Sequence, residues 1–392
     1  MEIEKYINKK KELYDILLKF IENGNDNNDT DYQNLIKNID DQKILENGKE
    51  LKEFLHIVLK ISKNHHRYSD FFSKIERILI YCKDSIKQTF SNLEIFNFFK
   101  SHKLILFFLL KNEVLFFDQL ITNIIIEKVD SDPFFSFYFF PEIKDFVDED
   151  TRHRIESKII KMDSNIFDNF DKKRQFGQND SYLANLIRED SINEFISYVK
   201  EQNLSISSTI KHSIFETNLF LLKNKEPTLI EYAAFFRSIQ IIQYLRKSDV
   251  ELTPSLWLYS IHGRNTQLIQ LLKENKIEPE DKTYKRCLEE SIKCHHNDIT
   301  NSILDNFLNK DEELKFNDNN FDDNVVAYCF HYYNFSYMPQ NFINRIVFCY
   351  LCKYDYYTFV DLFLQVQNKL LYSTIISTKK YFLNQIPKSL FF

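Results

Sequence analysis

The stretch that decides the fold is TLIEYAAFFRSIQIIQYL, residues 228–245, because similar stretches recur along the chain. SLWLYSIHGRNTQLIQLL, from Ser255, and RCLEESIKCHHNDITNSI, from Arg286, align with it without a gap. YLANLIREDSINEFISYV, from Tyr182, and IVFCYLCKYDYYTFVDLF, from Ile346, follow the same pattern. The three aligned stretches begin 27 and 31 residues apart, and recurrence at such spacings is typical of proteins built from stacked repeats.

Each stretch predicts two short antiparallel helices. Small residues occupy the sixth position of three stretches, where they let the second helix pack closely; they are Ala233, Ser260 and Ser291. The fourteenth and fifteenth positions hold a mostly apolar pair in each stretch: Ile241 and Ile242, Leu268 and Ile269, Ile299 and Thr300, Phe195 and Ile196, and Phe359 and Val360. A helix pair of this kind cannot cover its own apolar face, so we expect the units to stack.

The pattern resembles the ankyrin repeat, whose signature runs TPLHxAAxxGHxxIVxLLL. The residues that match it best are Thr228, Ala233, Ala234, Ile241, Ile242 and Leu245. KSDVE, from Lys247, is similar to the connecting finger of that repeat, and ENKIE, from Glu274, is a weaker copy. The block at 180–310 is also similar to a domain of unknown function found beside ankyrin repeats in protist proteins. The N-terminal region resembles the region that precedes this domain in a large lineage-expanded protist family.

The resemblance implies an all-α protein with two regions. A helical N-terminal region, 1–175, would precede an ankyrin-like α-solenoid of degenerate helix-turn-helix repeats at 176–392. Its best repeats lie at 180–310 and a weaker copy at 346–364. The charged stretch DKKRQFGQND, 171–180, is the expected boundary, and it reads as a polar linker.

The chain departs from the ankyrin signature at the glycine that ends the first helix. Its place is taken by Arg237, Arg264, His295, Asp355 and Asp190. That glycine adopts a left-handed conformation, which costs an arginine roughly 1 kcal/mol. We therefore expect a rebuilt turn, and Gly263 is a candidate to serve the unit that begins at Ser255.

Composition and charge narrow the possible functions. Only 4 of 392 residues are glycine, which disfavours a sheet-rich fold with many tight turns. The net charge of -6 gives no electrostatic support for nucleic-acid binding. The apolar run from Leu104 is interrupted by Lys111, Glu113 and Asp118, so it predicts a buried helix pair and no transmembrane segment. The start MEIEKYINKK lacks the apolar core of a secretory signal, so we expect a cytoplasmic protein.

Cysteine and histidine residues offer an alternative chemistry. Cys294, His295 and His296 are consecutive, and Cys349 and Cys352 form one CxxC pair. A convincing zinc signal needs two such pairs, and the repeat register places the second cysteine of the pair at a small apolar position. Walker A, GxGxxG, GxSxG and HExxH patterns are absent from the sequence. We expect no catalytic residue, cofactor or metal. The alternatives are a zinc- or thiol-dependent protein using these residues, or peripheral membrane binding through the Phe-rich helices.

The resemblance implies that the protein is a non-catalytic scaffold, which binds protein partners through the concave face of its stack. In ankyrin repeats, partners contact the finger tips and the two residues before the turn glycine. Transferred in register, the predicted partner-binding residues are Phe235, Phe236, His262, Gly263, Lys293 and Cys294, with Lys247, Ser248, Asp249, Asn275 and Lys276 at the finger tips. The two phenylalanines are the expected anchor unless the N-terminal helices cover them. Trp257 is expected in the core, because large aromatic side chains supply buried area.

Overall fold

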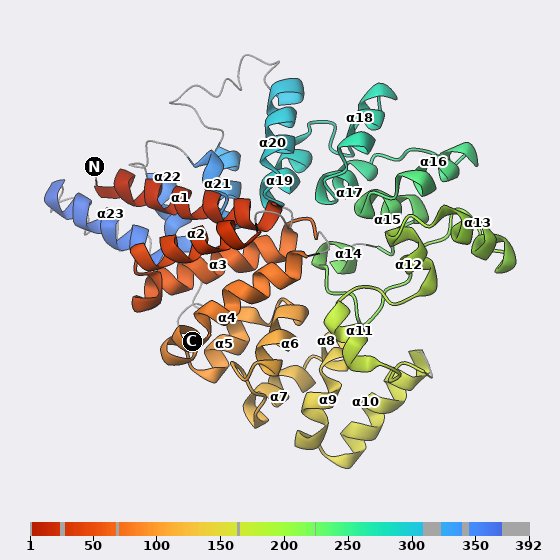
Figure 1. Cartoon of the computed structure of the whole chain (residues 1–392), viewed down its shortest axis with the longest axis horizontal. Helices are drawn as coiled ribbons and strands as arrows, with labels where there is room; N and C mark the ends of the chain where they lie inside the picture. Colours follow the sequence, from red (N-terminus) through yellow and green to blue (C-terminus); the bar gives the residue numbers. More distant parts are fainter. Residues whose placement is uncertain are drawn as a thin grey trace. The chain divides into compact units, whose positions relative to one another are not determined.

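The protein is all-helical in the part that the structure describes, as the sequence predicts. The structure is a computed structural model that describes residues 2–23, 28–67, 70–162, 165–223, 225–308, 323–338 and 345–370. In these ranges the only β-type pairing is an isolated bridge between Thr209 and Thr228. Figure 1 shows the helices in chain order. The chain divides into two compact units. Unit 1 comprises Met1–Lys60 and Leu304–Phe392, and unit 2 comprises Ile61–Ile303.

Unit 1 combines helices from early and late parts of the sequence. They are α1 (Glu2–Glu22), α2 (Asn28–Asp41), the 3-10 helix η2 (Ile44–Glu46), α3 (Gly48–Asn64, whose last turn belongs to unit 2), the π-helix η4 (Leu304–Leu308), α21 (Asp323–Tyr332), the 3-10 helix η6 (Phe335–Tyr337), α22 (Arg345–Lys353) and α23 (Tyr357–Leu370). Helix α1 packs on α2 and α23. Lys10 of α1 is buried and lies 2.5 Å from Glu50 and 3.3 Å from Glu53 of α3, so an ion-pair network joins α1 to α3.

The first part of unit 2 holds the Phe-rich helices. They are α4 (Phe71–Thr89), α5 (Asn92–Phe99), α6 (Lys103–Lys111), α7 (Gln119–Ile126), α8 (Pro133–Tyr138), α9 (Phe140–Ile143), the 3-10 helix η3 (Lys144–Phe146), α10 (Glu149–Met162) and α11 (Phe170–Phe176). Helices α6 and α7 are the helix pair predicted from the run at Leu104, and the side chains of Leu104, Leu109 and Ile121 are buried. Among the described residues, no helix is both long and apolar enough to cross a bilayer.

The predicted linker at 171–180 is wrong in its first half, which lies in α11. Arg174 is buried there, and its guanidinium lies 4.2 Å from the centre of the Phe107 ring and 2.7 Å from Glu142. A guanidinium that is stacked on a ring and paired with a carboxylate can be buried at little cost, which local sequence does not reveal. The expected boundary after residue 175 falls inside unit 2.

The rest of unit 2 contains four helical hairpins. They are α12 (Tyr182–Arg188) with α13 (Ile192–Glu201), α15 (Leu229–Phe236) with α16 (Ile239–Lys247), α17 (Leu256–His262) with α18 (Thr266–Glu274), and α19 (Lys285–Lys293) with α20 (Asn297–Ile303). The two helices of each hairpin pack together, and the first helices pack in order, α12 on α15, α15 on α17 and α17 on α19. A short helix, α14 (Leu219–Lys223), precedes α15 in the chain. The fifth similar stretch forms α22 and α23 of unit 1.

In the turn between the two helices of each hairpin, a residue other than glycine adopts the left-handed conformation. The five residues in the place of the glycine have φ between 49° and 63°; they are Asp190, Arg237, Arg264, His295 and Asp355. The N–H of the following residue donates to the carbonyl five residues before it, as in Ser238 to Ala233 at 2.9 Å and Asn265 to Ser260 at 2.7 Å. This bond defines the Schellman helix end. The expectation of a rebuilt turn is therefore wrong, because the hydrogen bonds outweigh the modest cost of the left-handed residue.

Gly263 has a different role from the one expected. Its φ is -73°, and the next residue, Arg264, takes the left-handed conformation instead. A Cβ atom at position 263 would lie 2.2 Å from the carbonyl oxygen of Phe235. The glycine is needed because the backbone of α15 comes too close for any side chain.

A side-chain hydrogen bond joins the second, third and fourth hairpins of unit 2 to the hairpin before each of them. The side chain that follows the left-handed residue donates to a carbonyl at the end of the previous first helix. The pairs are Ser238 Oγ to Ile187 at 2.5 Å, Asn265 Nδ2 to Ala234 at 3.2 Å and His296 Nδ1 to Ile261 at 2.9 Å. In unit 1, Tyr356 OH donates to Phe330 at 3.0 Å in the same way. Each accepting carbonyl lies three residues before a left-handed residue, where the helix leaves one of its acceptor positions unfilled.

Removing one inter-hairpin bond should destabilise the protein. Ser238→Ala leaves the Ile187 carbonyl without its side-chain donor inside the core, so we expect the free energy of unfolding to fall by about 1–2 kcal/mol. Ser248→Ala is the matched control, because the Ser248 hydroxyl is half-buried and bonds within its own helix. Urea unfolding of the full chain measures both variants. Equal losses in the two variants would contradict the assigned role.

Adding a glycine at one position and removing one at another should change the free energy of unfolding in opposite directions. Lys276 is exposed and left-handed, with φ 54°, so Lys276→Gly should raise the free energy of unfolding by about 0.5–1 kcal/mol. Gly263→Ala should lower it by about 1–3 kcal/mol, because the new methyl group meets the Phe235 carbonyl. Thermal unfolding midpoints test the pair. A stable Gly263→Ala protein would refute the close approach of α15.

Candidate functional site

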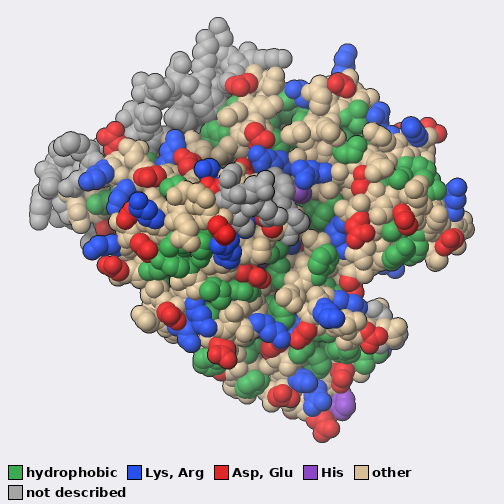
Figure 2. Space-filling view, viewed as in Figure 1, with side chains coloured by type: hydrophobic (Ala, Val, Ile, Leu, Met, Phe, Trp, Pro, Cys, Tyr) green, Lys and Arg blue, Asp and Glu red, His purple; other side chains and the backbone are tan. Residues whose placement is uncertain are grey.

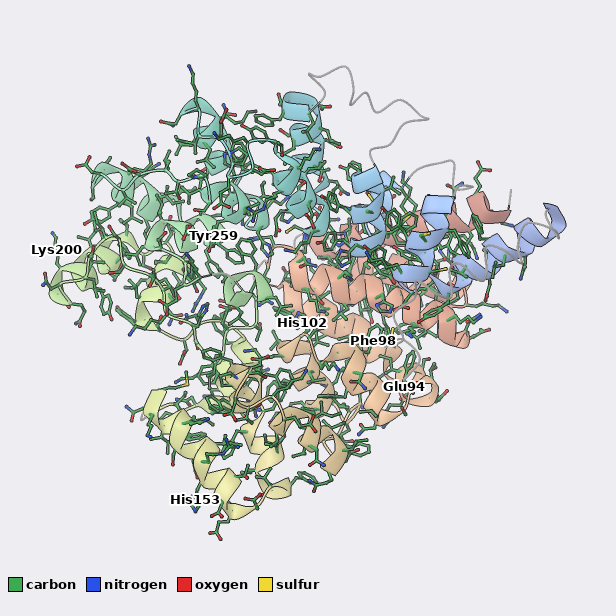
Figure 3. All side chains as sticks on the ribbon, turned by 180° about the vertical axis from the view of Figure 1, so that it is seen from behind. Glu94, Phe98, His102, His153, Lys200 and Tyr259 are labelled. Carbon is green, nitrogen blue, oxygen red and sulfur yellow. The ribbon has the colours of Figure 1, made fainter. Side chains whose placement is uncertain are left out.

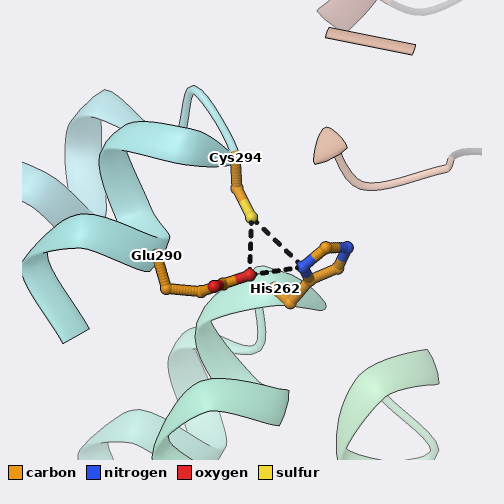
Figure 4. A group of neighbouring side chains, drawn as sticks. All are labelled: His262, Glu290 and Cys294. Carbon is orange, nitrogen blue, oxygen red and sulfur yellow. Dashed lines mark hydrogen bonds and ion pairs between the residues drawn. The ribbon is translucent and has the colours of Figure 1, made fainter. Parts of the chain in front are cut away.

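A polar group of three side chains lies at the ends of α17 and α19 (Figure 4). His262 is the last residue of α17, Glu290 lies near the end of α19, and Cys294 caps α19. A spacing of four residues places Glu290 and Cys294 on one face of the helix. The packing of α17 on α19 brings His262 to that face. The group is therefore assembled by the stacking of the third hairpin on the fourth.

The three side chains converge on one nitrogen atom. His262 Nδ1 lies 2.7 Å from Glu290 Oε1 and 3.3 Å from Cys294 Sγ. The thiol sulfur lies 3.5 Å from the same carboxylate oxygen. Lys293 Nζ lies 3.0 and 2.9 Å from the two Glu290 oxygens. Among the described residues, no other group of three or more histidine, cysteine or acidic side chains meets so closely.

Burial and neighbouring charges fix the ionisation of the group. Burial raises the pKa of the Cys294 thiol well above its usual value, and the Glu290 carboxylate raises it further. Burial lowers the pKa of His262 despite its bond to Glu290. Burial acts to raise the pKa of Glu290, but Lys293 and His262 outweigh it and the pKa falls to about 2. At neutral pH an ionised carboxylate thus faces a neutral thiol and imidazole, with Lys293 as its counter-ion.

The geometry does not fit a thiol nucleophile. In such a site the imidazole contacts the thiol through one ring nitrogen and is oriented by an acid at the other. Here Glu290 and Cys294 both contact Nδ1 of His262, while Nε2 has no hydrogen-bond partner within the described protein. Glu290 and the thiol therefore contact the same ring nitrogen. Glu290 cannot at the same time orient the His262 ring for proton abstraction from the thiol.

Helix α14 covers this group. The centre of the Phe220 ring lies 4.5 Å from the centre of the His262 ring, 4.9 Å from that of Tyr259 and 5.9 Å from that of Phe235. Lys293 Nζ lies 5.8 Å from the same Phe220 ring. The aromatic ring of α14 therefore lies over side chains of two neighbouring hairpins.

The segment that follows α3 covers the turn between α19 and α20. His65 Nδ1 lies 2.9 Å from the carbonyl oxygen of Cys294, and the N–H of His66 lies 3.4 Å from His296 Nε2. His296 donates through its other nitrogen to Ile261, so neither nitrogen of its ring is available to the polar group. His296 and the buried His295 lie outside the group, although both adjoin Cys294 in sequence.

The structure divides the predicted partner-binding residues by exposure. Phe235, His262, Gly263 and Cys294 are buried; Phe236, Ser248 and Lys293 are half-buried; Lys247, Asp249, Asn275 and Lys276 are exposed. The expectation of an exposed aromatic anchor is wrong for Phe235, because α14 lies over it. In Figure 3, Tyr259 lies among packed helices, whereas Lys200 of α13 points outward at the edge. Partner binding by any of these residues stays a prediction.

The two cysteines of the CxxC pair differ from the expectation in their exposure. Cys349 is half-buried and Cys352 is exposed in α22 of unit 1. The expectation of a buried small side chain at position 352 is wrong, because Leu351 takes the buried face and the next residue points about 100° away from it. Trp257, in contrast, is buried as predicted, and its Nε1 donates to the carbonyl of Ile277 at 2.8 Å.

Two residues of the site were missed from the sequence. Glu290 precedes Cys294 by four residues on a predicted helix, and that spacing could have linked them. Phe220 lies in a stretch without repeat signal, so no local pattern connects it with His262. The peripheral-membrane alternative also stays a prediction. Phenylalanines of this region such as Phe96, Phe107 and Phe137 are buried, whereas Phe116, Phe146 and Phe176 are exposed.

Comparison with known protein families, curated proteins and solved structures found no match to this chain.

Removing the aromatic cover should expose the Cys294 thiol. Phe220→Ala deletes the ring over His262, so local opening of α14 should raise the alkylation rate of Cys294 by about ten-fold or more. Cys287, buried in the same helix, should change little. Phe176→Ala, at an exposed ring, is the matched control. Site-resolved mass spectrometry of the alkylated full chain measures the rates.

A parallel increase at Cys294 and Cys287 would indicate unfolding of the whole hairpin stack. An unchanged rate at Cys294 would show that Phe220 does not protect it. Either result would contradict the assignment of α14 as a local cover.

Proposed function

We propose that the protein is a non-catalytic protein-binding module whose hairpins form an ankyrin-like stack. The observation that carries the proposal is the same bond between successive hairpins, made by Ser238, Asn265 and His296. Hairpins fixed in one register present the same turn of each unit side by side. Repeat proteins of this architecture use such surfaces for recognition.

The binding surface that we propose consists of the turns after α13, α16 and α18, here called the tips: residues 201–203, 247–249 and 274–276. Each tip contains one left-handed residue, which is Asn203, Asp249 or Lys276. The N–H of the next residue bonds back to the helix, as in Val250 to Leu245 at 3.1 Å. A fixed backbone with exposed polar side chains reduces the ordering cost of binding.

The tips are preferred over the concave positions because of their exposure. Lys247, Asp249, Asn275 and Lys276 are exposed, whereas Phe235 and His262 lie beneath α14 and Cys294 is buried. Figure 2 shows side chains of both charge signs over the helices that carry the tips. Mixed charge favours a protein partner with complementary charges over a polyanion.

Charge reversal at the tips should abolish partner binding without unfolding the protein. The triple variant Lys247→Glu, Asp249→Lys, Lys276→Glu changes the net charge by -2. We expect recovery of a partner on the immobilised full chain to fall about ten-fold or more. The thermal midpoint should stay within about 3 °C of the wild type, because the side chains are exposed. Quantitative mass spectrometry and thermal unfolding measure the two effects.

Lys87→Glu, at an exposed position of α4, changes the net charge equally and should leave recovery unchanged. Phe235→Asp should instead lower the thermal midpoint strongly, because it places a carboxylate in the core. The proposal fails if the triple variant recovers every protein that Lys87→Glu recovers.

A further inference from the structure

We propose that His262, Glu290 and Cys294 form a binding site for one zinc-class divalent cation between the third and fourth hairpins. The site goes beyond the proposed protein binding and does not depend on it. Its donors are an imidazole nitrogen, a carboxylate oxygen and a thiolate sulfur, the mixed set that zinc and cobalt accept. Calcium and magnesium prefer all-oxygen sites, so the sulfur selects against them.

The convergence of the donors favours a cation over a hydrogen-bond relay. Glu290 Oε1 and Cys294 Sγ both approach His262 Nδ1, at 2.7 and 3.3 Å. The Nδ1 proton serves Glu290, and the thiol proton is directed at the same carboxylate oxygen at 3.5 Å, so no proton accounts for the 3.3 Å approach of the sulfur to Nδ1. A cation at the centre of the three atoms accepts a lone pair from each.

The distances are close to those of a tetrahedral site. Zinc bonds of about 2.0–2.3 Å place neighbouring ligand atoms roughly 3.3–3.6 Å apart. The sulfur lies 3.3 Å from the nitrogen and 3.5 Å from the oxygen, within or at the edge of that range. Only the oxygen and nitrogen, which now share a hydrogen bond at 2.7 Å, must move apart. Rotation of the Glu290 side chain supplies this movement.

The electrostatic field of the surrounding helices favours a positive charge at the site. Helices α17 and α19 both end there, and helix C-termini carry partial negative charge. The Lys293 ammonium now supplies the positive charge, at 2.9 Å from Glu290 Oε2. The Lys293 side chain is 23% exposed, so it can swing toward solvent and release Oε2 as a fourth donor.

Cation binding requires a definite proton balance. The Cys294 thiol loses its proton to solvent, and the His262 proton moves to Nε2 so that the Nδ1 lone pair faces the ion. Glu290 is already ionised. One proton is therefore released for each cation bound, which makes the affinity increase with pH.

Cobalt titration of the metal-free full chain tests the site, because cobalt bound to a thiolate gives a sulfur-to-metal charge-transfer band in the near ultraviolet. We expect the band to saturate at one cobalt per chain and to disappear on addition of zinc. Cys294→Ala and His262→Gln should abolish it. Cys287→Ala, at a buried thiol in the same helix outside the group, should retain it.

Lys293→Met provides a test that does not rely on loss of binding. Removal of the competing ammonium should tighten cobalt binding about ten-fold, because like charges no longer repel at the site. This variant keeps the test decisive if Cys294→Ala or His262→Gln fails to fold, which circular dichroism would show.

Three results would overturn the proposal. The first is the absence of the band in the wild-type protein. The second is its persistence in folded Cys294→Ala, which would assign cobalt to other thiols such as Cys349 and Cys352. The third is unchanged or weaker cobalt binding by Lys293→Met.

Discussion

The bond from the turn of one hairpin to the helix end of the previous hairpin is the constraint on which unit 2 depends. The carbonyls of Ile187, Ala234 and Ile261 each accept a hydrogen bond from a side chain of the next hairpin. The donors are a serine, an asparagine and a histidine, which share no chemistry except a donor at the right position. The register of the stack is thereby fixed through buried polar groups, whose loss is more costly than their formation is favourable.

The same constraint creates the polar group at the hairpin ends. Because α17 and α19 are held side by side, His262 must meet Glu290 and Cys294. A buried carboxylate is tolerated there because Lys293 compensates its charge and His262 hydrogen-bonds to it. Phe235 and His262, at two of the positions that serve partners in ankyrin repeats, are covered by α14 in this chain. Exposed polar side chains lie at the tips, and the covered positions form an interior in which Glu290 and Cys294 approach His262 Nδ1.

The left-handed turns show that local sequence can be misleading about turn conformation. Arg237 and Arg264 suggested a rebuilt turn, since the left-handed conformation costs an arginine about 1 kcal/mol. Two backbone hydrogen bonds at each helix end and the side-chain bond to the next hairpin outweigh that cost. Conversely, Gly263 suggested a turn residue, but its role is steric. A glycine requirement that arises from a neighbouring helix cannot be distinguished, in sequence, from one that arises from φ.

The sequence by itself determined the helices, the pairing of helices into hairpins and the burial of the small and aliphatic positions, because these follow from periodicities shorter than one repeat. Ala233, Ser260 and Trp257 are buried as predicted. Only the tertiary structure decided that Phe235, His262 and Cys294 are interior residues. Their cover comes from Phe220 and from His65, which lie far away in the chain or outside the repeat pattern. Contacts between such segments depend on where the helices place them, and no local spacing of residues encodes that.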